Sequence, residues 1–273
     1  MEIKNPDCVE IKKPDCGNEY LKWISENCKE FTCDEEKEKT YYEAVTQKIS
    51  EKFKASNFWK DIISGLKSNN EAYLVRTNYH LYQRIEEPDI LIKPFSSLIE
   101  KTYRLNISQN NKWPDEPSEG WILPINWFDK INDIVRTSFV VKYLDGVDFL
   151  IGKLEEGCHK NNLTCKNFFE AREEGYYAAH LNIDFPVSIP KRDWDTIEII
   201  AKIEIQVTTQ LQDVIKNLLH KYYELRRIRI KPTEVKWQWN YKSAEFATNY
   251  LGHILHYVEG MIMEIREKQQ ERD

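Results

Sequence analysis

The segment from residue 195 to residue 209 constrains the fold more than any other, because it is the clearest strand in the chain. Its β-branched side chains and its alternation of apolar and polar residues predict a half-buried strand. Only Ile200 breaks the alternation. One face is apolar and carries Ile197, Ile199, Ala201, Ile203, Ile205 and Val207. The other face carries Glu204 and Gln206, and it is either solvated or the floor of an active site.

The remaining periodic segments predict an α/β (α+β) protein with a mixed sheet flanked by helices. Helices are expected from about 18 to 67, 147 to 160, 210 to 226 and 243 to 269, and further strands at 131–144 and 180–185. Ser68-Asn69-Asn70 is expected to end the first helical region, and Asp145-Gly146 is expected to form a turn. We expect an N-terminal leader and helical extension (1–70), a main domain (71–230) and a C-terminal helix (231–273).

The composition favours a soluble protein with a packed core, since 41% of the 273 residues are hydrophobic and 31% are charged. The net charge of −6 argues against general adhesion to DNA, although a local basic patch is compatible with it. No apolar run approaches the roughly 18 residues of a membrane span. The N-terminus lacks the apolar core of a signal peptide. We therefore expect a cytoplasmic protein that binds neither DNA nor a membrane.

Two groups of residues raise the question of zinc. Four of the six cysteines lie in the first 33 residues, but no Cys-x-x-Cys pair occurs, so free thiols are favoured. His253, His256 and Glu259 lie near one face of the predicted C-terminal helix. A polar seam against the core is the favoured interpretation there, and zinc is the alternative.

Two further segments have residue types that suit phosphate and metal chemistry. Lys93 precedes a predicted helix on which Ser97 and Lys101 are one turn apart, an arrangement that suits a polyphosphate. A solvated lysine-rich helix face is the alternative. Asp133 opens a predicted buried strand, where a bound metal would offset the cost of burying a carboxylate. A partly exposed strand end explains Asp133 equally well.

The densest basic run in the chain extends from His220 to Lys231 at the end of a predicted helix. Cations at a helix C-terminus are favourable in themselves, because they complement the helix dipole. The alternative is a contact surface for RNA phosphates, with interleaved tyrosines for stacking. The residues assigned to this RNA surface are Lys221, Arg226, Arg227 and Arg229.

Four segments together resemble the synthetase domain of RelA/SpoT-type alarmone synthetases, over about residues 84 to 225. Lys93-x-x-x-Ser97-x-x-x-Lys101 is similar to the ATP-phosphate segment of that family, and Asp133-Ile-Val is similar to its first metal-binding aspartate. Gly175-Tyr176-x-x-x-His180 resembles its glycine-tyrosine loop, and Glu204-Ile-Gln206 resembles its Glu-x-Gln strand. The resemblance implies a nucleotidyltransferase-like mixed sheet.

The resemblance also implies a reaction, in which pyrophosphate moves from ATP to a ribose 3′-hydroxyl and AMP is released. Asp133 and Glu204 would be the catalytic carboxylates that hold Mg²⁺. ATP would be bound by Lys93, Ser97, Lys101 and Arg136. The acceptor would be bound by Tyr176, His180 and Gln206.

The chain departs from the family pattern where arginines are usual: Leu91, Ser138 and Thr208 stand in their places. Small members that resemble this chain include toxins that modify the 3′-terminal adenosine of tRNA, in toxin–antitoxin or phage-defence systems. The departures and the basic run favour tRNA as the acceptor over a free guanosine or adenosine nucleotide. A separate antitoxin protein would then be a partner. An inactive module that only binds a partner is the third hypothesis.

Overall fold

The computed structural model describes residues 13–29, 31–32, 34–192, 195–227 and 236–270, with the side chains of 219–227 and 270 excepted. The chain forms two compact units. Unit 1 comprises Met1–Ser50, Ile92–Val135 and Pro186–Lys202. Unit 2 comprises Glu51–Leu91, Arg136–Phe185 and Ile203–Asp273. The three-part division at residues 70 and 230 remains a prediction.

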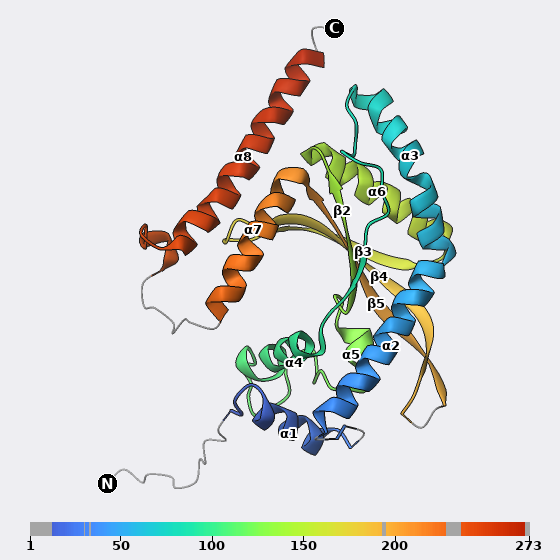
Figure 1. Ribbon diagram of the computed structural model, residues 1–273, viewed down its shortest axis with the longest axis vertical. Helices are drawn as coiled ribbons and strands as arrows, with labels where there is room; N and C mark the ends of the chain where they lie inside the picture. The colour runs from blue at the N-terminus through green and yellow to red at the C-terminus, as the bar shows by residue number, and fades with distance from the viewer. Residues whose placement is uncertain (1–12, 30, 33, 193–194, 228–235, 271–273) are drawn as a thin grey trace. The chain divides into compact units, whose positions relative to one another are not determined.

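A five-stranded mixed sheet with the order β1-β2-β5-β4-β3 organises the fold (Figure 1). Its strands are β1 (Ile90–Ile92), β2 (Val135–Val141), β3 (Thr164–Ala171), β4 (Tyr177–Pro190) and β5 (Thr196–Thr209). Most of the sheet belongs to unit 2, while β4 and β5 continue along the chain into unit 1. The predicted strand at 195–209 is confirmed as β5, which occupies the centre of the sheet.

The expectation that β5 is half-buried along its length is wrong for its C-terminal part. The apolar side chains of Ile203, Ile205 and Val207 are buried, as predicted. The polar side chains of Glu204 and Gln206 are buried too, each with 8% exposure, whereas the strand begins exposed. Since side chains of both faces are buried there, the C-terminal end of β5 is covered on both faces of the sheet.

Strand β3 was not predicted from the sequence. It pairs antiparallel with β4, so that Phe168 lies opposite His180 and Thr164 lies opposite Asp184. As an edge strand it is largely exposed, and Phe169 is 58% exposed. Its pairing with β4 therefore holds it in place more than burial does, and its sequence lacks the alternation that marks β5.

Three predicted boundaries also need correction. Ser68-Asn69-Asn70 does not break a helix, because it lies within α3 (Asn57–Thr77), where buried Asn70 accepts a hydrogen bond from Leu81 N at 3.0 Å. Asp145-Gly146 is not a turn between elements but the first turn of α6 (Leu144–Lys160). Strand β2 begins at Val135, so Asp133 lies in the preceding turn rather than in the strand.

Unit 1 is built mainly from helices around an aromatic core. Its helices are α1 (Asn18–Asn27), the first part of α2 (Glu35–Ala55), α4 (Phe95–Tyr103) and α5 (Trp127–Lys130), with a π-helix at Arg104–Ser108. Buried Tyr42 contacts the rings of Phe95, Trp127 and Phe128, with centroids 5.6–6.4 Å apart. These contacts fix α2 against α4 and α5, and thereby position the N-terminus of α4.

In unit 2, two helix pairs flank the sheet (Figure 1). Helix α3 packs against α6, and α7 (Gln210–Arg227) packs against α8 (Ala244–Gln270), next to a 3₁₀ turn at Trp237–Trp239. The predicted helices at 210–226 and 243–269 are thus confirmed. Of the described helices, none has the length and apolar character required to span a membrane.

Candidate active site

Unit 1 brings three of the predicted site residues together in one ion-pair cluster. Lys93 Nζ donates to Asp133 Oδ2 at 2.9 Å, and Lys101 Nζ donates to Asp133 Oδ1 at 2.8 Å. Burial tends to raise the pKa of Asp133, but the Lys101 and Lys93 ammonium groups outweigh it and hold that pKa below its ordinary value. Asp133 is therefore ionised at neutral pH, with both oxygens engaged.

The local backbone explains why Lys93 meets Asp133. Lys93 N–H donates to Ile134 O at 2.8 Å directly after β1, and buried Tyr42 donates its hydroxyl proton to Lys93 O at 2.7 Å. Pro94 is then the N-cap residue of α4, which begins at Phe95. Ser97 is partly exposed on the same helix as Lys101, one turn earlier. The predicted phosphate segment thus forms one continuous strand-to-helix junction.

Replacing Asp133 by Asn should destabilise the protein at pH 7 by about 2 kcal/mol, because it leaves two partly buried ammonium groups without a counter-charge. The depressed pKa of Asp133 stabilises the fold above the pKa of the unfolded chain, and this stabilisation is lost as the pH falls through the folded-state pKa. Urea unfolding between pH 2 and pH 7 should therefore show a shallower acid loss for Asp133→Asn than for wild type. Asp115→Asn, which changes an exposed carboxylate of the same unit, should leave that profile unchanged.

Unit 2 holds a second cluster, centred on buried His180 of β4. His180 Nε2 lies 3.1 Å from Glu170 Oε2, and His180 Nδ1 lies 3.6 Å from Glu204 Oε1. The Phe168 ring stacks on the imidazole at 4.9 Å. Sequence reasoning missed Glu170 and Phe168, because both lie on the unpredicted strand β3. The imidazole is thereby held between carboxylates of the two strands that flank β4.

Gln206 links Glu204 to a lysine that the sequence analysis did not single out. Gln206 Nε2 donates to Glu204 Oε1 at 2.5 Å, and Lys216 Nζ donates to Gln206 Oε1 at 2.9 Å. An ammonium can only donate and a carboxylate can only accept, so the two neighbours together fix the orientation of the Gln206 amide. The only sequence signal for Lys216 was a cation on the helix that follows the Glu204-x-Gln206 strand.

Tyr176 follows Gly175 at the start of β4, and its hydroxyl oxygen lies 3.3 Å from His180 Nε2. Burial, followed by the negative charges of Glu170 and Glu204, raises the pKa of Tyr176 to about 12. The hydroxyl therefore stays protonated at neutral pH. The Arg172 guanidinium lies over the ring, 5.3 Å from its centroid. One face of Tyr176 thus already has a cation–π contact, and the predicted stacking of a base remains a prediction.

Helix α8 closes against the loop that carries Tyr176. Gly175 adopts φ +79°, and its backbone lies so close to α8 that a Cβ on Gly175 would overlap Asn249 O and a Cβ on Gly252 would overlap Gly175 O. His253 bonds Tyr177 OH and Glu173 O, each at 2.8 Å. These contacts hold the glycine-tyrosine loop on the C-terminal helix.

The favoured interpretation of His253, His256 and Glu259 as a polar seam is confirmed by their contacts. His256 stacks on Tyr177 at 3.7 Å, and Glu259 accepts a hydrogen bond from Thr209 Oγ1. Within the described part of the chain, no three His, Cys, Asp or Glu side chains form a group that could hold a metal ion. The described cysteines (Cys16, Cys28, Cys158 and Cys165) are free thiols, and Cys8 and Cys33 lie outside the described residues.

The residues available for Mg²⁺ suit it chemically, because carboxylate oxygens are the protein ligands that Mg²⁺ prefers. Asp133 belongs to unit 1 and Glu204 to unit 2, so a metal held by both stays a prediction. In unit 1, a cation at Asp133 would compete directly with Lys93 and Lys101 for the carboxylate oxygens. Phosphate groups that draw these lysines away would free Asp133 for a metal.

Unit 2 also contains a cavity of about 1010 Å³ next to the Glu204–Gln206–Lys216 chain. Arg136, Gln206 and Lys216 line it, so the predicted ATP-binding arginine and one predicted acceptor residue face the same space.

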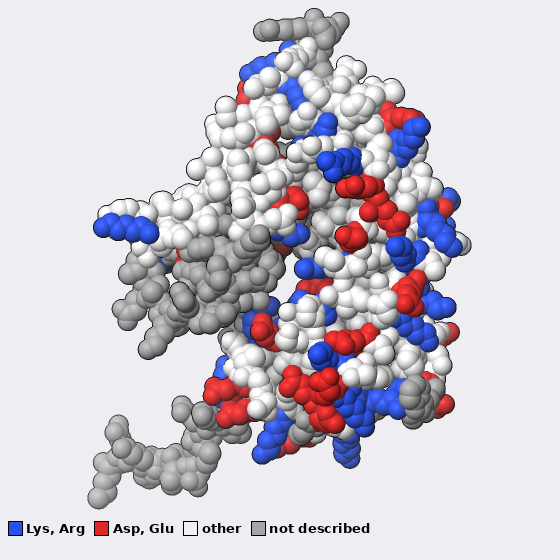
Figure 2. Space-filling model, viewed as in Figure 1, with Lys and Arg blue, Asp and Glu red and all other residues white. Residues whose placement is uncertain are grey.

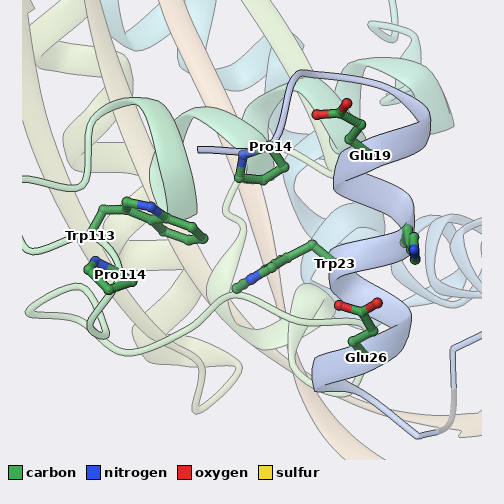
Figure 3. A pocket seen from close by; sticks show the side chains of 7 residues that line it. Pro14, Glu19, Trp23, Glu26, Trp113 and Pro114 are labelled. Atoms are coloured by element: carbon green, nitrogen blue, oxygen red, sulfur yellow. The ribbon is translucent and has the colours of Figure 1, made fainter. Parts of the chain in front are cut away.

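Unit 1 has a separate pocket of about 410 Å³, in which Trp23 and Trp113 lie near Pro14 with Glu19 and Glu26 beside them (Figure 3). None of the predicted site residues lines that second pocket.

The predicted RNA surface falls where the structure describes little. Lys221, Arg226 and Arg227 lie in α7, but their side chains are outside the described residues, and Arg229 is wholly outside them. On the face of the molecule shown in Figure 2, Lys and Arg are interspersed with Asp and Glu. The role of the basic run therefore remains a prediction.

Comparison with known proteins places the fold. No protein-family model and no curated protein sequence matches the chain. Small alarmone synthetase 1 from Bacillus subtilis is 15% identical with a TM-score of 0.52, and the match covers 83% of this chain and 95% of that one. The same synthetase bound to its product pppGpp is 15% identical with a TM-score of 0.50, covering 82% and 94%. A GTP pyrophosphokinase family protein from Streptococcus pneumoniae is also 15% identical, with a TM-score of 0.50, covering 88% and 97%.

Proposed function

We propose that this chain, which has the fold of the small alarmone synthetases, is an ATP-dependent pyrophosphokinase. The observation that carries the proposal is the buried carboxylate of Glu204 on the central strand, held between His180 and Gln206. Carboxylate oxygens are the protein ligands that Mg²⁺ prefers, so Glu204 suits a magnesium–nucleotide complex at this strand.

In the proposed reaction, Lys93, Ser97 and Lys101 bind the phosphates of ATP at the N-terminal end of α4. Lys93 and Lys101 would then donate their hydrogen bonds to phosphate oxygens instead of to Asp133, because phosphate oxygens are also strong acceptors. Asp133 and Glu204 would then provide oxygen ligands for Mg²⁺, which neutralises charge on the phosphate chain when bound. Transfer of this kind depends on positioning and electrostatics rather than on a covalent intermediate.

The transfer step is a displacement at the β-phosphorus of ATP. The acceptor 3′-oxygen forms a bond to that phosphorus, the bond from the phosphorus to the bridging oxygen of AMP breaks, and AMP leaves. We assign the proton of the acceptor hydroxyl to Glu204, which His180 and Gln206 keep in position. Tyr176 and Gln206 would orient the acceptor itself.

For the acceptor, we propose the 3′-terminal adenosine of tRNA, which would make the protein a cytoplasmic inhibitor of translation with a separate antitoxin. Leu91, Ser138 and Thr208 stand where the resembled family usually has arginines, which disfavours ordinary nucleotide binding. The basic run up to Lys231 supplies charge for RNA. A free guanosine or adenosine nucleotide is the second candidate, because one of the similar structures is a synthetase bound to pppGpp.

A single transfer assay tests the reaction and its acceptor. The protein is incubated with γ-labelled ATP, Mg²⁺ and one acceptor at a time, which is GDP, GTP, unlabelled ATP or deacylated tRNA. In a parallel series, EDTA replaces Mg²⁺. We expect label in tRNA, dependent on Mg²⁺, and none in tRNA whose terminal ribose has been oxidised with periodate. Label in a nucleotide would overturn the tRNA acceptor and retain the chemistry. Label in no acceptor would leave a module that only binds partners.

A further inference from the structure

Two cations face the cavity of unit 2 without a carboxylate partner. Arg136 on β2 and Lys216 on α7 both line the cavity of about 1010 Å³. No described residue forms an ion pair with either side chain, and no described residue accepts a hydrogen bond from Arg136. Most buried or partly buried cations are paired, so two unpaired ones at one cavity point to a missing anion.

The one hydrogen bond that Lys216 makes is to a neutral group. Its ammonium donates to Gln206 Oε1 at 2.9 Å, and two of its three protons remain available. Since the Gln206 amide is fixed between Lys216 and Glu204, the lysine cannot turn away without releasing that amide. Lys216 is therefore held at the cavity wall with donors to spare.

The electrostatics at this wall favour an anion as well. Burial, followed by the positive charge of Arg136, lowers the pKa of Lys216, while Asp213 and Glu204 act in the opposite direction. The two cations thus repel each other, and a bound anion would relieve this repulsion.

Several acidic side chains also line the cavity, but two have partners of their own. Glu87 accepts from the Trp59 indole at 3.1 Å and pairs with Lys54 at 3.5 Å, and Asp213 accepts from Asn217 at 3.2 Å. The remaining charged lining residues are Arg84, Glu86 and Asp89, which are exposed. On the wall formed by β2, β5 and α7, the two cations Arg136 and Lys216 outnumber the one lining carboxylate, Asp213.

We propose that Lys216 and Arg136 together bind a phosphate group in this cavity, with Gln206 as the link from the phosphate site to Glu204. This inference rests on the proposed function, for which it identifies a second phosphate site separate from Lys93 and Lys101. The phosphate comes either from a nucleotide or from RNA, which share the same chemistry. A planar guanidinium next to an ammonium suits either source.

The first test measures binding of inorganic tripolyphosphate to the full-length protein by calorimetry. Lys216→Met and Arg136→Met should each weaken binding about tenfold, the loss expected for one charged hydrogen bond. Both variants should also show a shallower dependence of affinity on salt, which a purely structural change would not produce. Lys216→Arg should retain most of the affinity. Lys153→Met, which removes a lysine paired with Glu156 on α6, should bind like wild type.

The outcome separates this inference from the proposed function, because tripolyphosphate binding requires no transfer. If folded Lys216→Met, checked by circular dichroism, binds tripolyphosphate with the same stoichiometry and the same affinities as wild type, the phosphate site is refuted even where transfer activity is found. If binding depends on Lys216 but no acceptor is labelled, the site stands and the proposed reaction fails. Repeating the titration with ATP, GDP and deacylated tRNA identifies the source, as the ligand whose affinity falls most in Lys216→Met.

Discussion

Glu204→Gln is expected to reduce pyrophosphate transfer by about a thousandfold, the largest effect of any single substitution in this chain. The change keeps the size of the side chain but removes its charge, and with it the oxygen ligand for Mg²⁺ and the acceptor for the hydroxyl proton. The hydrogen bond from Gln206 can be kept, because the amide oxygen of the new side chain still accepts a proton from Gln206 Nε2. Label transfer from ATP to the preferred acceptor measures the loss.

Glu198→Gln is the matched control, since Glu198 lies on the same strand but is exposed. It should transfer pyrophosphate at the wild-type rate. The role assigned to Glu204 would be wrong if the Glu204→Gln variant, with its unfolding midpoint unchanged, kept more than about a tenth of the wild-type rate.

Gly252→Ala should destabilise the protein by about 2 kcal/mol and lower transfer as well. A Cβ at position 252 would collide with the backbone of Gly175, which cannot yield as the end of a flexible side chain could. The collision would push α8 away from the loop before β4, and Tyr176 lies next in that loop. Urea unfolding and the transfer assay should therefore both respond to this substitution.

Gly260→Ala provides the comparison on the same helix. A Cβ there meets no atom within 4 Å, so the better helix propensity of alanine should stabilise the protein by up to about 1 kcal/mol. If Gly252→Ala were instead as stable as Gly260→Ala, the close approach of α8 to Gly175 would not exist in solution.

Some features followed directly from the sequence, because they depend on neighbours along the chain. The alternation from Ile197 to Val207 located β5 to within one residue, and helical periodicity located α7 and α8 equally well. The order of four short segments indicated the fold that the structural comparisons then confirmed. Similarly, the spacing of Ser97 and Lys101 placed them one turn apart on α4.

Other features were decided only by the tertiary structure, because they depend on how one element pairs with or packs against another. Strand β3 exists through its pairing with β4, and so Glu170 reaches His180 although its own segment has no clear period. Nothing in the sequence distinguished Lys216 from other lysines on helices. Its role appears only in the fold, where α7 places its ammonium against Gln206.

Asp133 shows the division most clearly. From the sequence alone, Asp133 had two interpretations, a metal ligand or a partly exposed strand end. The fold placed two lysines within 3 Å of it, from a segment some 30 to 40 residues earlier in the chain. Local periodicity fixes where a helix or strand forms, whereas the cost of burying charge is met only by partners that the completed fold supplies.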